Sequence, residues 1–181
     1  MKDGEGRGKG ILVYRLGHRF VRDDRTMTHL CLVSRALGAE RIYLQEVEKD
    51  VPGTVQKVNE DWGGEFQVVT SANWKKVIAD AKSAGRKVVH LTMYGVPLQD
   101  VVEELQRQEK LLFVVGGPKV PGFVYHESDY NVAVTSQPHS EIAALAITLH
   151  DVQSGEELKK NFGKSRLRIL PTARGKRVVR N

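Results

Sequence analysis

Residues 116–151 read GGPKVPGFVYHESDYNVAVTSQPHSEIAALAITLHD, and this stretch decides the fold. It contains two turns rich in Gly, Pro and small polar residues, GGPKVPG (116–122) and TSQPHSE (135–141). Each turn follows an apolar run, LLFVV (111–115) or NVAV (131–134), and the second turn leads into a strongly helical segment. Short apolar runs that end in such turns are typical of buried parallel strands. Because ligands of open α/β sheets bind at the carboxyl edge of the strands, both turns are candidate ligand loops.

Outward from this stretch, β-prone runs alternate with helical patterns along the whole chain. The runs predict strands at 10–14, 40–47, 65–69, 86–95, 111–115 and 131–134. Helices are expected from Thr26 or Thr28 to Gly38, at 54–62 after a Pro52-Gly53 break, at 74–85 behind an Asn73 cap, at 97–107 and at 140–150. This alternation predicts an α/β fold with a mostly parallel, doubly wound sheet flanked by helices.

Composition limits the classes of protein to consider. At 181 residues, with 40% hydrophobic and 28% charged residues, the chain is expected to form one soluble domain. No apolar run approaches the roughly 20 residues of a membrane-spanning helix, so we expect no membrane partner. The single cysteine, Cys31, excludes an internal disulfide framework and a Cys-rich zinc site. A reducing, cytoplasmic location is the resulting expectation.

The two ends of the chain differ from the middle in charge and composition. Residues 1–10 are polar and Gly-rich, and we expect a disordered or flexible leader there. Residues 153–181 form a basic extension, which from Gly163 onward contains Lys and Arg but no acidic residue. This extension is either a solvated, partly disordered tail or an edge element that lays basic charge against RNA. The net charge of +6 favours a polyanionic partner.

Several common catalytic motifs are absent. No GxGxxG follows the first predicted strand and no P-loop pattern occurs, which argues against these two nucleotide sites. The six histidines are scattered without metal-ligand spacing, so no metal site is expected. His139 lies near Ser136 and Ser140, but the GxSxG elbow of a serine nucleophile is missing.

What remains is a ligand site made of backbone loops. A third turn, TMYG (92–95), joins the two quoted above at the end of another predicted strand. Glycines let a flat ligand approach the chain closely, and Val96, Val120 and Val134 are placed to sandwich an aromatic base. The alternative is that the three turns are merely tight strand-to-helix connections.

A cluster of cationic and titratable residues follows the first predicted strand. The cluster comprises Arg15, His18, Arg19, Arg22, Arg25 and His29. Local ion pairing with Asp23 and Asp24 is one explanation. The other is functional, because an arginine there can orient a phosphate or favour the deprotonation of a hydroxyl through its positive field.

Residues 115–151, VGGPKVPGFVYHESDYNVAVTSQPHSEIAALAITLHD, resemble the knotted SPOUT-class methyltransferases. Together with residues 14–44, YRLGHRFVRDDRTMTHLCLVSRALGAERIYL, they are similar to the archaeal family that methylates the ribose 2′-oxygen of cytidine 56 in tRNA. The resemblance covers roughly residues 12–152 and implies a SPOUT-like domain over 11–152, with a deep trefoil knot in its C-terminal third. It further implies S-adenosylmethionine as cofactor, the TΨC loop at the tRNA elbow as partner, and a homodimer that packs Ile142, Ala143 and Leu149 together.

The resemblance also implies roles for individual residues. Cofactor binding is expected at Leu91, Thr92, Tyr94, Gly95, Gly116, Gly117, Lys119, Val120, Val134, Ser136, Gln137, Pro138, His139 and Ser140. RNA contacts are expected at Arg15, Arg19, Lys119, Arg166, Arg168, Arg174, Lys176 and Arg177. The family's usual catalytic arginine position falls on Leu32, so that role is expected to pass to Arg22 or Arg25, with His29 nearby.

Two other functions stay open at this point. One is a SPOUT-class enzyme that modifies a base, rather than ribose, in tRNA or rRNA. The other is a non-catalytic RNA-binding module whose loops grip only phosphate. Cofactor binding separates the module from the enzymes, and the chemical position of the methyl group separates the two enzymes.

Overall fold

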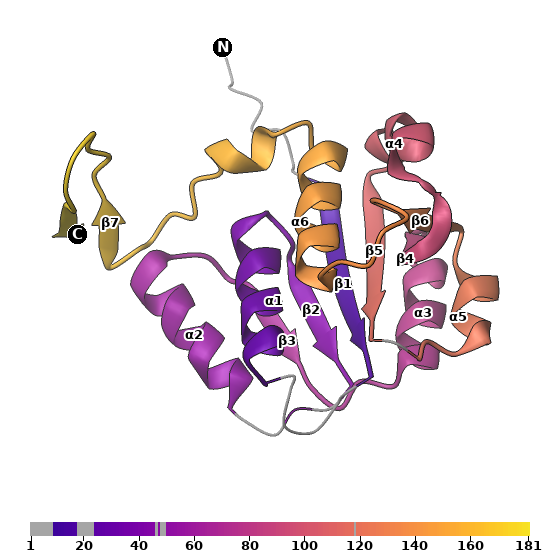
Figure 1. Cartoon of the computed structure of the whole chain (residues 1–181). Coiled ribbons are helices and arrows are strands. Elements are labelled where there is room, and N and C mark those ends of the chain that lie inside the picture. The colour runs from indigo at the N-terminus through magenta and orange to yellow at the C-terminus, as the bar shows by residue number, and fades with distance from the viewer. Residues whose placement is uncertain (1–8, 18–23, 46, 48–49, 118) are drawn as a thin grey trace, which may run out of the picture.

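The computed structural model describes residues 9–17, 24–45, 47, 50–117 and 119–181 (Figure 1). Six strands form the main sheet: β1 (Gly10–Leu16), β2 (Arg41–Leu44), β3 (Gln67–Val69), β4 (Lys87–Pro97), β5 (Lys110–Gly116) and β6 (Tyr130–Ala133). Six α-helices accompany them: α1 (Asp24–Ala36), α2 (Val51–Trp62), α3 (Trp74–Ser83), α4 (Leu98–Gln106), α5 (Gly122–Glu127) and α6 (Glu141–Val152). All the strands predicted within the first 134 residues are therefore present.

The sheet is parallel at every pairing, in the order β3-β2-β1-β5-β4-β6. Strands β1 and β5 form its centre, and their pairing runs from Gly10 against Lys110 to Leu16 against Gly116. Both strands are buried along nearly their whole length, as central strands of a parallel sheet must be. The prediction of a mostly parallel α/β sheet is confirmed.

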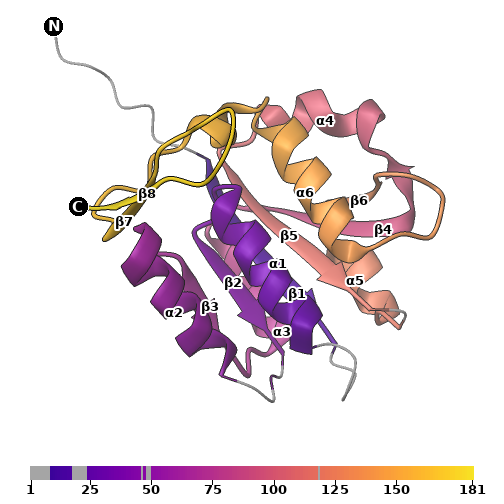
Figure 2. The ribbon, with the colours of Figure 1, turned by 60° about the vertical axis from the view of Figure 1, so that its left-hand side comes forward.

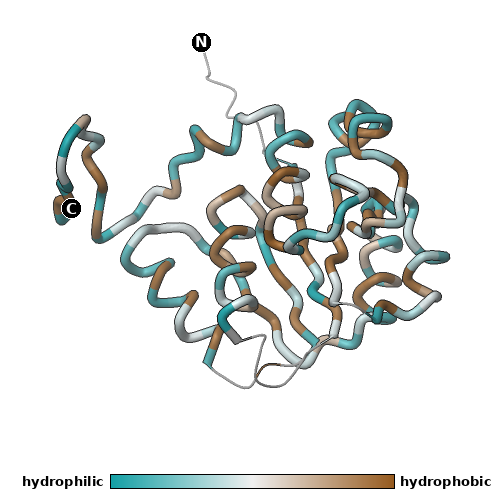
Figure 3. The backbone as a smooth tube through the Cα atoms, viewed as in Figure 1, coloured by the Kyte–Doolittle hydropathy of each residue, from teal (hydrophilic) through white to brown (hydrophobic). Residues whose placement is uncertain are grey.

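Helices cover both faces of the sheet, and alternate strand residues point to opposite faces. On β1, Ile11 and Val13 join a core with α1, α2, α4 and α6, while Leu12 and Tyr14 join a core with α3 and α5. Figures 1 and 2 show these two helical layers on either side of the strands. In Figure 3 the brown, apolar residues follow the strands and the inward sides of the helices. No helix in the described ranges is long and apolar enough to cross a membrane.

Helix caps lie where the sequence predicted them in two cases, and three helices differ from expectation. Helix α1 begins at Asp24, so Thr26 and Thr28 lie inside the helix and do not cap it as expected. Asn73 accepts from the backbone N–H of Lys76 to begin α3, and Ser140 caps α6. Helix α2, however, begins at Val51, because Asp50 caps it and the proline of the predicted break fits into the first turn, where no N–H bond is lost. Helix α5 was not predicted, since its six residues follow a Gly/Pro-rich turn.

The end of β4 departs from regular pairing. Leu91 and Val96 both align with Val132 of β6, so residues 92–95 bulge out of the sheet. A Cβ added at Gly95 would lie 2.5 Å from the backbone of Asn131 and Val132. Gly95 is therefore needed so that the returning chain can pack directly on β6.

The basic extension forms an element of its own. After the 3₁₀ turn η1 (Glu156–Lys159), strands β7 (Leu167–Ile169) and β8 (Val178–Arg180) pair with each other in antiparallel fashion. This hairpin forms a separate two-stranded sheet and is not the partly disordered tail of the first alternative, while the basic element directed at RNA stays a prediction. A lone hairpin has few residues to bury, which explains why its own hydrophobic pattern gave little indication of strands.

The extension is anchored on the C-terminal ends of α1 and α2. The buried guanidinium of Arg35 lies 4.8 Å from the ring centroid of Phe162, and its Nε donates to Asn59 Oδ1 at 2.8 Å. At the end of α2, a Cβ on Gly63 would lie 2.0 Å from the carbonyl oxygen of Gly163. Gly63, with a φ of 81°, thus permits a backbone crossing that no other residue allows.

Candidate active site at the carboxyl edge of the sheet

The bulged end of β4 and the loops that follow β5 and β6 converge on one cavity of about 590 Å³. The volume lies within the range of about 300–1,000 Å³ that is usual for small-molecule sites. Eleven of the fourteen residues expected to bind the cofactor line it: Leu91, Thr92, Tyr94, Gly116, Gly117, Val120, Val134, Gln137, Pro138, His139 and Ser140. Gly95, Lys119 and Ser136 do not line it. Three segments that are far apart in sequence thus meet where a parallel sheet usually binds its ligand.

The cavity wall combines an apolar floor with polar groups. Val120, Val132 and Val134 supply branched apolar surface from the ends of β5 and β6. The backbone of Gly116 lies close to the side chain of Val120, since a Cβ on Gly116 would lie 2.6 Å from Val120 Cγ2. Gly117, in contrast, has room for a Cβ, whose nearest neighbour would be Arg15 Nη2 at 4.0 Å. A flat heteroaromatic group with polar substituents fits such a wall.

Arg15 and Glu141 form a buried ion pair in the cavity wall. Nε and Nη2 of Arg15 each lie 3.2 Å from Oε1 of Glu141, and the side chains are 4% and 17% exposed. The pair joins the centre of the sheet to the first turn of α6. The sequence predicted an RNA contact for Arg15, and the structure places this residue inside the cavity wall with Glu141 as partner.

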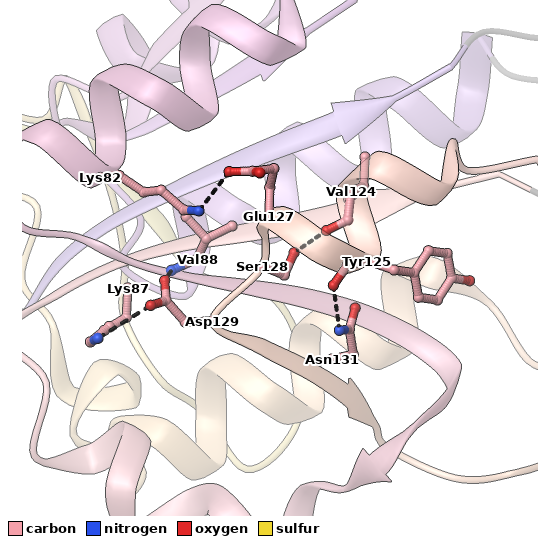
Figure 4. A network of polar contacts seen from close by, with 9 residues as sticks. All are labelled: Lys82, Lys87, Val88, Val124, Tyr125, Glu127, Ser128, Asp129 and Asn131. Atoms are coloured by element: carbon pink, nitrogen blue, oxygen red, sulfur yellow. Dashed lines mark hydrogen bonds and ion pairs between the residues drawn. The ribbon is translucent and has the colours of Figure 1, made fainter.

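A second polar cluster in the cavity wall comprises His90, Asn131, Tyr125 and Thr92, of which all but Asn131 line the cavity. Asn131 Nδ2 donates to the carbonyl oxygen of Tyr125 at 2.9 Å (Figure 4), so its Oδ1 faces His90 Nδ1 at 2.9 Å. His90 Nδ1 therefore carries a hydrogen and the unprotonated Nε2 is an acceptor. Burial lowers the pKa of His90, and the hydrogen bond to Asn131 offsets this only in part.

The lowered pKa of His90 predicts a pH dependence of stability. In the unfolded chain His90 binds a proton with the ordinary pKa of 6.5, whereas in the folded chain it binds a proton only at lower pH. The free energy of unfolding should therefore fall as the pH drops below 6.5. His90→Gln stays neutral at every pH and should show a smaller loss between pH 7.5 and pH 5. Urea titrations of both proteins at the two pH values measure the difference. Equal losses in the two proteins would contradict the assignment.

The candidate catalytic residues are only partly described. Arg22 and the expected RNA contact Arg19 lie outside the described residues. Arg25 and His29 are exposed and, four residues apart on α1, share one face of the helix. Neither lines the cavity, although Thr26 between them does. Arg25 is therefore adjacent in sequence to the cavity wall rather than part of it.

Several residues of the cavity were not among those expected to bind the cofactor. They are Arg15, Thr26, His90, Met93, Tyr125, Val132, Glu141 and Ala144. A signal for His90 was available, because it shares with Thr92 the period-two face of a strand that leads into a predicted ligand loop. No local pattern pointed to Tyr125, which belongs to the unpredicted helix α5.

A second cavity of about 720 Å³ lies at the other edge of the sheet, where residues 160–164 cross the amino ends of β2 and β3. It belongs to the junction that anchors the extension. The amino edge of a parallel sheet is not where such folds bind their ligands. The carboxyl-edge cavity is therefore the better candidate for chemistry, although it is the smaller of the two.

Comparison with known proteins decides the family. Residues 62–179 match the family model described as tRNA ribose 2′-O-methyltransferase, aTrm56. The chain belongs to this family. It is 48% identical to the tRNA (cytidine(56)-2′-O)-methyltransferase of Nitrosopumilus maritimus over 93% of the chain and 95% of that protein. The protein of that name from Methanopyrus kandleri is also 48% identical, over 93% and 96%.

Solved structures agree with this family on the fold. The TrmH/SpoU tRNA modifying enzyme of A. aeolicus superposes with a TM-score of 0.64 at 16% identity, over 84% of this chain and 78% of that one. The SpoU methyltransferase AviRb from Streptomyces viridochromogenes, solved in complex with AdoMet, gives 0.59 at 11% identity, over 83% and 59%. The expected SPOUT-like fold is confirmed by this likeness.

Proposed function

We propose that the carboxyl-edge cavity binds S-adenosylmethionine and that the chain uses it to methylate the ribose 2′-hydroxyl of cytidine 56 in tRNA. One observation carries the proposal: the bulge of β4 and the loops after β5 and β6 line a cavity of about 590 Å³ in a chain of the tRNA ribose 2′-O-methyltransferase family. The chain is thus a tRNA methyltransferase, and no observation favours base methylation or a non-catalytic module.

The cavity residues fit this cofactor. The three valines of the floor suit a flat adenine, and the polar rim formed by Gln137 to Ser140 suits a ribose and an amino acid group. Gly116 and Gly117 leave their backbone open to the ligand. When bound, S-adenosylmethionine supplies an electrophilic methyl group on a positively charged sulfur.

The chain's own residues then have two tasks. The first is to hold the ribose 2′-oxygen about 3–3.5 Å from the reacting carbon and in line with it, and this positioning supplies much of the rate. The second is to make a weakly acidic hydroxyl nucleophilic. Arg25 or Arg22, with His29 nearby, would stabilise the negative charge that develops on the 2′-oxygen as its proton leaves.

Basic residues elsewhere are proposed to hold the tRNA. Lys119 and the hairpin residues Arg168, Arg174, Lys176 and Arg177 are exposed. Arg166 is also exposed, at 74% of its side chain, and its Nη1 lies 3.8 Å from Asp61 Oδ1. Such side chains bind phosphates without reading sequence, so their proposed role is to position the TΨC loop at the tRNA elbow. A cytoplasmic location accords with a tRNA substrate.

A homodimer through α6 is part of the proposal. Its exposed residues Ala143 and Ile147, the latter 45% exposed, form an apolar strip that a second copy could cover. Leu149, expected at the interface, is instead fully buried in the core of its own subunit and is unavailable to a partner. Sedimentation velocity of the purified chain would test for the dimer.

The decisive experiment maps the methyl group. The chain is incubated with S-adenosylmethionine and an unmodified tRNA transcript, and the product is hydrolysed in alkali and analysed by mass. We expect one alkali-resistant linkage after cytidine 56, because a methylated 2′-oxygen can no longer attack the neighbouring phosphate. A methylated nucleotide released by alkali would indicate base methylation. Calorimetry that detects no cofactor binding at millimolar concentration would leave only an RNA-binding module.

A further inference from the structure

An aromatic pair lies beside the cavity without lining it. Trp74, the first residue of α3, and Phe123, the second of α5, have ring centroids 5.4 Å apart and planes inclined by 66°. Phe123 is 46% exposed, and Trp74 is partly exposed. These two large aromatic rings therefore expose apolar surface to water at the ligand-binding edge of the sheet. A bound partner would bury that surface.

A lysine lies against both rings. The ammonium of Lys75 is 5.5 Å from the ring centroid of Trp74 and 5.8 Å from that of Phe123. Its neighbour Lys76 instead pairs with Asp80 on the same helix, at 3.1 Å. The two adjacent lysines therefore differ, because one is directed to a carboxylate and the other to the aromatic pair.

The pair is held in place by the far ends of its two helices. Lys82, near the end of α3, donates to Glu127 at the end of α5 at 2.8 Å (Figure 4). Ile78 of α3 and Val124 of α5 are buried in the same core below the sheet. Because both helices are fixed to the sheet and to each other, the two rings are pre-organised rather than free to collapse.

The aromatic pair is continuous with the cavity. Val120 lines the cavity, and both Val120 and Trp74 pack against the same hydrophobic core. Phe123 is three residues further on, so the Cα atoms of Val120 and Phe123 are at most about 11 Å apart. A nucleotide next to one whose ribose enters the cavity would therefore reach the rings.

We propose that Trp74, Phe123 and Lys75 form a stacking platform for an unpaired nucleobase of the RNA substrate. The proposal rests on the function proposed above, because a ribose can enter the cavity only if its nucleotide leaves the surrounding stack. A base from the same loop then stacks on the rings, and this contact replaces the base stacking that was lost. Lys75 then moves from the ring faces to the adjacent phosphate.

The chemistry of the platform favours RNA over a protein partner. Single-stranded nucleic acid is recognised by aromatic side chains that stack on bases, together with cations that bind the backbone. The net charge of +6 and the basic hairpin agree with a polyanionic partner. Every nucleobase has a π-face, so this platform would hold an opened loop without recognising its nucleotide sequence.

Substitutions on the platform should weaken RNA binding and leave cofactor binding intact. Phe123→Ala and Lys75→Ala should each raise KM for an unmodified tRNA transcript, by about tenfold for Phe123→Ala, with S-adenosylmethionine affinity unchanged. Phe123→Tyr should restore the wild-type KM. Matched controls are Lys76→Ala, one residue away on α3, and Leu158→Ala, which removes a still more exposed apolar side chain from η1.

Tryptophan fluorescence gives a readout that does not depend on turnover. The chain has two tryptophans, and Trp62→Phe leaves Trp74 alone. Adding the transcript without cofactor should quench Trp74, and Phe123→Ala should reduce the quenching at a given RNA concentration. An unquenched Trp74 at saturating RNA, or an unchanged KM in Phe123→Ala, would overturn the platform.

The two proposals fail in different ways. If cytidine 56 is methylated but the platform variants match the wild type, only the platform is wrong. If the transcript quenches Trp74 and Phe123→Ala weakens its binding, yet no ribose methylation occurs, the platform stands as an RNA site and the proposed function is wrong.

Discussion

Gly117→Val is expected to lower the affinity for S-adenosylmethionine by about a hundredfold while the protein stays folded. A Cβ at Gly117 meets no protein atom closer than 4.0 Å, so the fold has room for the new side chain. The isopropyl group would instead enter the cavity that the ligand needs, and overpacking of this kind costs about 1–3 kcal/mol. A loss at the upper end of that range corresponds to about two decades of affinity.

Calorimetric titration with the cofactor measures this effect, and thermal unfolding checks that the fold survives. The matched control is Gly122→Val in the same loop region, since an added Cβ there has no neighbour within 4 Å and Gly122 does not line the cavity. Wild-type affinity in Gly117→Val would place the cofactor elsewhere. Gly116 is a poorer choice, because its Cβ would collide with Val120 and disturb the loop itself.

Arg25→Ala should reduce kcat by about a hundredfold and leave cofactor affinity unchanged. Removing one positive group that stabilises a developing oxyanion typically costs two to three decades in rate. Arg25 immediately precedes the cavity residue Thr26 but does not line the cavity itself, so its loss should spare the bound cofactor. Single-turnover methylation of a tRNA transcript measures the rate.

Three further variants make this result interpretable. Arg25→Lys keeps the charge and should retain part of the activity, and Arg22→Ala tests the other candidate in the same segment. Arg107→Ala removes an exposed arginine from α4, far along the chain, and should match the wild type. If Arg22→Ala and Arg25→Ala both turn over at the full rate, the assignment of catalysis to this segment is wrong.

The sequence predicted the sheet well because its strands carry their own signal. LLFVV is continuously apolar and is followed by Gly116, and the resulting β5 is buried from Leu111 to Val115. The loops that follow could be placed at one edge because parallel strands end together. The convergence of Gly117 and Gln137 on one cavity follows from that rule alone.

The parts that were missed depend on contacts between distant residues. Arg15 and Glu141 are separated by 126 positions, and only the folded chain shows that they pair. Helix α5 is too short for a helical period to appear, and with it Tyr125 and Phe123 were lost as site residues. The tail hairpin depends on its docking against Arg35, which local propensity does not encode.

The anchoring of the hairpin sets the distance between its basic side chains and the carboxyl-edge cavity. Its base is tied to Asp61 near the end of α2, at the amino edge of the sheet, whereas methyl transfer is proposed at the carboxyl edge. Strand β1 alone, at seven residues, separates these edges by about 20 Å. An RNA that touches both ends of one subunit must extend as far as about six stacked base pairs. If the hairpin and the cavity contact the same RNA, as proposed, a folded RNA must span this distance to bind at both places.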